Sequence, residues 1–116
     1  MDYFLNRASI IGLLEANAHV FFKDNNEQLA TITLLTPIDS SISGDSEQFQ
    51  KHRVLVEDSL WVEYVISCLS EGNLVFVEGE LDQTAGDSGS TWIVVSKKFG
   101  TIHPIHSHVH IFGESA

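Results

Sequence analysis

Three histidines near the end of the printed sequence have the spacing that most directly suggests chemistry. His106, His108 and His110 alternate with other residues, so in an extended strand their imidazoles would share one face. Imidazole nitrogens bind zinc, copper and nickel, which makes these residues a weak candidate metal site. The same spacing also suits the polar face of a terminal strand. We prefer that second interpretation, because the sequence indicates no fourth ligand, and we expect no cofactor.

A second stretch, GDSGS at 86–90, is similar to the segment that carries the nucleophile in trypsin-like proteases. That chemistry needs a histidine base and an acid held by a double barrel, for which 116 residues are too few. A hairpin loop rich in glycine and serine explains the same residues. No other activated nucleophile, phosphate-binding loop or acid pair stands out, so we expect that the protein is not an enzyme.

Cations are scarce in this chain. Sixteen acidic residues outnumber six basic ones, and the formal net charge is −10. Proteins that bind polyanions ordinarily offer a basic stripe whose contacts release counterions. Only a local cluster of cations could therefore support phosphate binding here. The basic residues are Arg7, Lys23, Lys51, Arg53, Lys97 and Lys98.

Length and composition indicate one globular domain. With 116 residues, of which 43% are hydrophobic, the chain can build one core but not two. The sequence opens without the basic segment of a secretory signal and has no run of about 18 apolar residues that would span a membrane. We expect a cytoplasmic protein with no membrane partner, a single domain over residues 1–112 and a short C-terminal tail over 113–116.

The segment 51–81 reads as a strand, a helix and a strand. In the first strand Val54 and Val56 point to one face, and Lys51, Arg53 and Glu57 point to the other. One face is therefore mostly apolar, and the other is polar and partly basic. Gly79 lies inside the second strand, where a glycine marks a bend or the close approach of another backbone.

Between these strands a helix is expected over residues 60–70. Ser59 can cap its N-terminus, and Gly72 can end it in the left-handed conformation. The only cysteine, Cys68, falls within the apolar pattern, so we expect a small core residue and no intrachain disulfide. The apolar residues cover more than one narrow stripe. The helix therefore either contacts something beyond its own barrel or plugs the barrel and leaves apolar surface exposed.

The other strands follow from alternation and from turn residues. We expect a first strand over 4–15, which bends at Gly12 and continues over 19–22. A second strand is expected over 29–36 and is stopped by Pro37, and a further strand is expected over 91–96. The segment 37–48 reads as an acidic loop. Together these elements predict an all-β protein, a five-stranded OB-fold barrel with one short α-helix between strands 3 and 4.

The ordered series of segments resembles the bacterial-type single-stranded DNA-binding proteins, of which this chain would be a divergent member. The resemblance covers residues 5–105 and includes the strand, helix and strand described above. It is carried by NR at 6–7, SIIGLL at 9–14, LATITL at 29–34, HRV at 52–54, EG at 71–72, VFVEGEL at 75–81 and IVV at 93–95.

The resemblance implies that the chain binds single-stranded DNA without sequence preference in the groove of the OB fold, mainly through phosphate contacts and with weak stacking. The residues expected to bind are Arg7, Lys51, Arg53, Trp92, Lys97 and Lys98. The family's stacking aromatics fall on Ser40, Lys51, Glu57 and Gly86, none of which is aromatic. Phe49 and Trp92 are candidate substitutes for stacking, whereas Glu57 adds a repulsive charge.

The family also suggests a homo-dimer or homo-tetramer that pairs through residues 10–14, and a role in DNA replication and DNA repair. The family's acidic tail is missing, since the printed sequence ends HIFGESA, so recruitment of partners by that tail is not expected. An alternative is an OB-fold structural or protein-interaction module that has lost nucleic-acid binding. The missing aromatics and the net charge of −10 favour this alternative.

Overall fold

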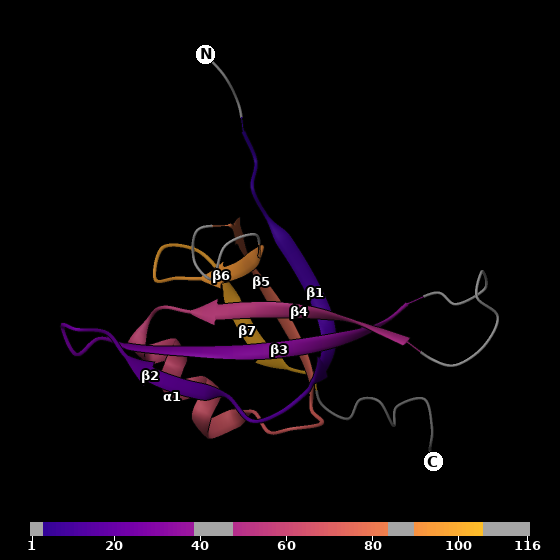
Figure 1. Cartoon of the computed structure of the whole chain (residues 1–116), viewed down its shortest axis with the longest axis horizontal. Coiled ribbons are helices and arrows are strands. Elements are labelled where there is room, and N and C mark those ends of the chain that lie inside the picture. Colours follow the sequence, from indigo (N-terminus) through magenta and orange to yellow (C-terminus); the bar gives the residue numbers. More distant parts are fainter. Residues whose placement is uncertain (1–3, 39–47, 84–89, 106–116) are drawn as a thin grey trace.

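A computed structural model describes residues 4–38, 48–83 and 90–105 (Figure 1). In this part of the chain seven strands and one helix follow one another. They are β1 (Ala8–Leu14), β2 (His19–Phe22), β3 (Gln28–Ile38), β4 (Gln48–Val56), α1 (Ser59–Cys68), β5 (Leu74–Asp82), β6 (Trp92–Val95) and β7 (Thr101–Pro104).

Five of the strands close into a barrel. The hydrogen-bonded order β1-β3-β4-β6-β5 returns to its start because β1 also pairs with β5. The contact between β4 and β6 is parallel and the others are antiparallel. Two further strands extend the sheet, β2 on β3 and β7 on β5. The helix joins β4 to β5, which are the third and fourth barrel strands, so the predicted OB fold is confirmed.

The core fills the inside of the barrel as the alternation predicts. Ala30, Ile32 and Leu34 of β3 are buried, and so are Val54 and Val56 of β4. Residues between them on the same strands face outward, because successive side chains of a strand point to opposite sides. From α1, Val62 and Val65 complete this core. Burial of these side chains removes apolar surface from water, which is the main force that closes the barrel.

Two glycines lie where barrel strands approach too closely for a side chain. A Cβ placed on Gly12 would lie 2.7 Å from the carbonyl oxygen of Leu35, and one on Gly79 would lie 2.4 Å from that of Val94. The close backbone contact predicted at Gly79 is thereby confirmed. Barrel closure at these points depends on the absence of a Cβ.

The helix ends differ from the prediction. Asp58, not Ser59, is the N-cap, because its extended backbone lets Oδ2 accept hydrogen bonds from the backbone N–H groups of Leu60 (3.1 Å) and Trp61 (3.3 Å). The helix ends at Cys68 rather than at residue 70. Gly72 has the expected left-handed backbone, φ +90°, but in the turn that follows the helix.

Cys68 was expected in the core, and this prediction is wrong. Its side chain is exposed, because α1 buries only the stripe that contains Val62 and Val65. The apolar side chains of the helix outside this stripe lie in solvent, and both Leu60 and Ile66 are more than half exposed.

Removal of the Asp58 cap is expected to lower the free energy of unfolding. Asp58→Ala leaves two backbone N–H groups at the start of α1 without their acceptor, and loss of such a cap costs about 1 kcal/mol. Urea denaturation followed by circular dichroism measures the change. Asp58→Asn keeps a side-chain oxygen at the cap, so it should retain most of the stability. Equal destabilisation by both changes would contradict this role for the cap.

Two strand predictions also need correction. Pro37 does not stop its strand, because β3 continues to Ile38 and Pro37 pairs with Phe49 of β4. Within the described residues β1 pairs with β3 only opposite Leu34 and Leu35. At Pro37 the strand thus has one described neighbour, and the missing N–H is tolerated there. His19–Phe22 forms a separate strand on β3 rather than a continuation of the first strand. The strand expected over 91–96 is β6, the last strand of the barrel, and β7 adds to β5 outside the barrel.

The division between residues 112 and 113 falls outside the described residues and stays a prediction. Among the described residues, the only helix spans ten positions, and no helix is long and apolar enough to cross a lipid bilayer.

Candidate nucleic-acid interface

The outward sides of β2, β3, β4 and β6 form one continuous surface, which we call the outer face (Figure 1). Cross-strand partners point to the same side of a sheet, and the register places Thr31 opposite both His19 and Leu55, and Leu55 opposite Val94. The described residues of the outer face are His19, Phe21, Leu29, Thr31, Thr33, Leu35, Pro37, Phe49, Lys51, Arg53, Leu55, Glu57, Trp92 and Val94.

The centre of the outer face is apolar. Leu29, Leu55 and Val94 are buried in a cluster separate from the barrel core, and Phe21 and Trp92 pack against it. Phe21 comes from β2 and Trp92 from β6, so aromatic rings lie on the two outermost strands of this surface. Because Leu29, Leu55 and Val94 are buried, the two rings that pack against them form the apolar platform that unpaired bases can contact.

Arg53 lies over the Trp92 ring. Its guanidinium carbon is 5.8 Å from the ring centroid, within the range of a cation–π contact. Trp92 is half-buried, and its Nε1 has no hydrogen-bond partner among the described residues. Packing against the apolar cluster therefore holds the ring. Among the described residues no ion pair involves Arg53, so its charge remains available to an anion.

The prediction from sequence missed two aromatic rings of this surface. His19 stacks on Phe21 with ring centroids 5.9 Å apart, and both rings lie on the outer face. The sequence signal was the hairpin between 19–22 and 28–31, in which Phe21 lies opposite Leu29. Phe49, which was proposed as a stacking substitute, is the second residue of β4, on the same side as Arg53, and is 43% exposed.

Lys51 is already paired within the chain. Its Nζ lies 3.1 Å from Glu15 Oε2. Glu15 follows β1, and its backbone N–H donates to the carbonyl oxygen of Thr33, 2.9 Å away. The carboxylate is therefore held beside β3, where it partly neutralises the cation of the neighbouring strand.

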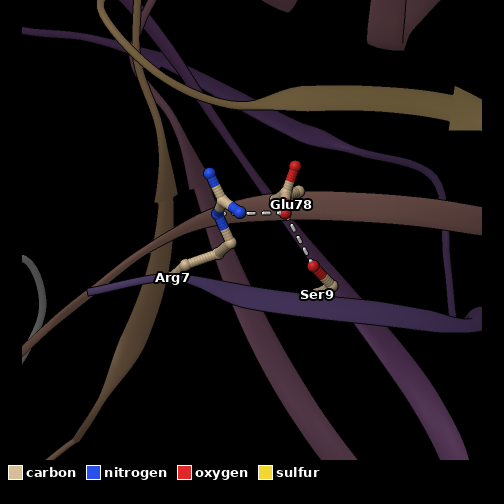
Figure 2. A network of polar contacts seen from close by, with 3 residues as sticks. All are labelled: Arg7, Ser9 and Glu78. Atoms are coloured by element: carbon tan, nitrogen blue, oxygen red, sulfur yellow. Dashed lines mark hydrogen bonds and ion pairs between the residues drawn. The ribbon is translucent and has the colours of Figure 1, made fainter. Parts of the chain in front are cut away.

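Arg7 lies on another part of the barrel, at the start of β1. Figure 2 shows its contact with Glu78 of β5, where Arg7 Nε is 3.4 Å from Oε2. The hydroxyl of Ser9 donates to the same oxygen at 2.9 Å. Arg7 also lies over the ring of Phe99, 5.5 Å from its centroid. These contacts tie the beginning of β1 to β5 and occupy the guanidinium.

Lys97 and Lys98 follow β6 in an exposed turn. They line a hollow of about 370 Å³ together with Ser96 and three carboxylates, those of Glu27, Glu57 and Asp58. No ion pair joins these lysines to the acids within the described residues. The local charge is nevertheless negative, so this hollow alone is a poor phosphate site.

The structure thus brings Arg53 and Trp92 together, with Lys51 on the same strand face. It places Arg7, Lys97 and Lys98 away from that contact. The family's stacking positions Lys51, on β4, and Glu57, directly after β4, are exposed. Ser40 and Gly86 lie outside the described residues.

His106, His108 and His110 also lie outside the described residues, so the candidate metal site stays a prediction. Among the residues that the structure describes, no three histidine, cysteine, aspartate or glutamate side chains lie together as metal ligands would.

Comparison with known proteins identifies a structural likeness. No family model matches the chain, and no curated protein matches it. A solved structure, "Plasmodium falciparum SSB complex with ssDNA", is similar with a TM-score of 0.75 and 21% sequence identity, over 91% of this chain and 99% of that one. At this identity the likeness shows a shared fold.

Proposed function

We propose that this protein binds single-stranded DNA without sequence preference on its outer face, as a divergent relative of the bacterial-type single-stranded DNA-binding proteins. The observation that carries the proposal is Arg53 over Trp92 at the edge of the apolar platform. A similar fold in a protein whose structure is a complex with single-stranded DNA supports it. No enzymatic activity is proposed.

The geometry suggests how such binding would work. Bases stack on Trp92, Phe21 and Phe49, and each stacked base contributes about 1–3 kcal/mol. The Arg53 guanidinium contacts a phosphate, either after it moves off the Trp92 ring or while it stays over that ring. Lys51 makes a second phosphate contact once its ion pair with Glu15 is broken. Few cations on a chain of net charge −10 imply weak binding that falls as salt screens the phosphate contacts.

Fluorescence titration with oligo-dT at two salt concentrations tests the proposal. Trp61→Phe leaves Trp92 as the only tryptophan, so its emission reports contact on the outer face. We expect quenching with micromolar affinity that weakens at the higher salt concentration. A folded protein whose Trp92 emission does not change at low salt would contradict binding at this surface.

Removal of the Glu15 carboxylate is expected to strengthen binding. Glu15→Gln frees Lys51 from its partner, and exposed ion pairs of this kind are worth about 0.2–1 kcal/mol, so we expect the affinity for oligo-dT to rise about two- to fivefold. Glu63→Gln, at an exposed position on α1, makes the same change in net charge away from the outer face. An equal rise for both variants would show that net charge alone, and not release of Lys51, is responsible.

We also propose a homo-dimer or homo-tetramer that pairs through β1. Six β1 residues, from Ala8 to Leu13, pair with β5, but β3 pairs only with Leu13 and Leu14 among the described residues. Within the part of the chain that the structure describes, much of one β1 edge is therefore unpaired, and Ile11 and Leu13 on β1 are exposed. Light scattering tests this proposal, and a strict monomer at all concentrations would exclude it.

Roles in replication and repair and a cytoplasmic location are further proposals, which rest on the family resemblance.

The second candidate function is a protein-interaction module without nucleic-acid binding. The exposed apolar side chains of α1, Leu60 and Ile66, and the net charge favour it. Absence of oligo-dT binding at low salt by the folded protein would select this function.

A further inference from the structure

His19 begins β2 on the outer face, where its imidazole lies against the ring of Phe21. The two ring centroids are 5.9 Å apart, and the ring planes differ by 28°. The side chain is exposed, and among the described residues no ion pair involves it. Imidazole is the side chain that ordinarily changes its charge between about pH 5 and 8. His19 can therefore add a cation to this surface without any change of fold.

The immediate neighbours of His19 on the outer face are uncharged. The register places Thr31 of β3 directly beside it. The charged residues of the outer face, Lys51, Arg53 and Glu57, all belong to β4 or follow it. That strand lies two strand spacings, about 10 Å, from β2. Salt at about 0.1 M largely screens exposed charges at this distance, so a charge on His19 acts mainly on what binds above it.

Charged groups on the elements next to β2 have other partners. Glu15, which precedes the turn into β2, forms the ion pair on β4 described above. Glu71 meets the same turn through its backbone N–H, which donates to Asn17 Oδ1 at 2.9 Å. After β2, Lys23 pairs with Glu27, with Nζ 3.6 Å from Oε1. Within the described part of the chain, no carboxylate lies at ion-pair distance from the imidazole, so a phosphate meets no internal competitor for it.

The outer face thus carries a ring and a basic side chain at each of its two borders. At β6, the Arg53 guanidinium lies 5.8 Å from the centroid of Trp92. At β2, on the side of β3 away from β4 (Figure 1), His19 lies against Phe21. A cation over an aromatic ring is stabilised by the ring. A strand whose bases stack on both rings carries its phosphates past both basic side chains.

We propose that His19 is a phosphate-binding residue of the outer face that acts in its protonated form, so that single-stranded DNA binds more tightly in mild acid. This inference rests on the proposed function and adds a pH-dependent contact to it. The protonated ring donates an N–H to a phosphate oxygen and carries a positive charge, whereas the neutral ring carries none. The added affinity is therefore present in mild acid and is lost as the pH rises and the ring gives up its proton.

Anisotropy of a labelled oligo-dT tests the inference at constant ionic strength between about pH 8 and about pH 5.5. All six histidines of the chain make its total charge less negative in acid, so every variant should gain some affinity. His19→Gln removes the proposed contact. The matched control is His103→Gln, because His103 is also exposed and lies against a ring, that of Phe76, but on β7. An exposed ion pair strengthens an association by up to about fivefold. We expect the acid gain of the unmodified protein and of His103→Gln to exceed that of His19→Gln by about three- to fivefold.

A permanent cation at the same position gives the converse test. His19→Lys should raise the affinity at about pH 8 by about three- to fivefold and reduce the further gain in acid to that of His19→Gln. His103→Lys makes the same change in net charge on β7 and should leave the pH dependence as it is. Circular dichroism checks that each variant is folded.

The outcomes separate this inference from the function on which it rests. Absence of oligo-dT binding by the folded protein at every pH would contradict the proposed function, and the inference with it. Oligo-dT binding whose acid gain is the same in His19→Gln and His103→Gln would overturn the inference alone. Equal affinities of His19→Lys and His103→Lys at about pH 8 would do the same, because total charge and not a contact at His19 would then govern the pH dependence.

Discussion

Arg53→Glu is expected to reduce the affinity for oligo-dT by about 100-fold. Arg53 is the cation of the outer face that no ion pair occupies among the described residues, and it lies over Trp92. A hydrogen bond to a charged group contributes about 1.5–3 kcal/mol, and the new carboxylate adds repulsion from the phosphates. Loss of one phosphate contact should also lower the slope of log affinity against log salt concentration by about 0.7.

The measurement is anisotropy of a labelled oligo-dT at several salt concentrations. Lys23→Glu is the matched control, because it makes the same change in net charge on the β2–β3 turn, where Lys23 already pairs with Glu27. We expect a loss of less than fivefold for Lys23→Glu. Equal losses in the two variants would mean that total charge, rather than a contact at Arg53, governs binding, and the proposed interface would be wrong.

Gly79→Ala is expected to destabilise the barrel by about 2–3 kcal/mol, the upper part of the range for overpacked sites. Its Cβ would lie 2.4 Å from the Val94 carbonyl oxygen and 3.0 Å from Cγ2 of Ile93. The first is a backbone atom, so β5 and β6 must separate where they close the barrel. Such a loss lowers the melting temperature of a domain of this size by about 10 °C.

Thermal and urea denaturation followed by circular dichroism measure this change. Gly72→Ala is the comparison, because its Cβ meets no atom within 4 Å and only the positive φ of +90° is strained. We expect about 1 kcal/mol for Gly72→Ala. If Gly79→Ala were no more harmful than Gly72→Ala, the close approach of β5 and β6 would not limit stability.

Alternation along the chain determined much of the barrel. The inward residues of β3 and β4, such as Ile32 and Val54, follow from a period of two that needs no knowledge of the partner strand. Gly79 marked a close contact because a glycine weakens the interior of a strand and is typically found where another backbone comes near. In contrast, the cap at Asp58 and the exposure of Cys68 were missed. Adjacent residues compete for the cap, and the side of a helix that is buried depends on what packs against it.

The sequence by itself determined a small closed β-barrel with one helix and a scarcity of cations, since alternation, turns and charge are local properties. Only the tertiary structure decided that Phe21 and Trp92, 71 positions apart, pack against one apolar cluster, and that Arg53 lies over Trp92 while Lys51 is paired with Glu15. The physical reason is barrel closure. It sets which strands lie side by side and in what register, and so which distant side chains share a surface.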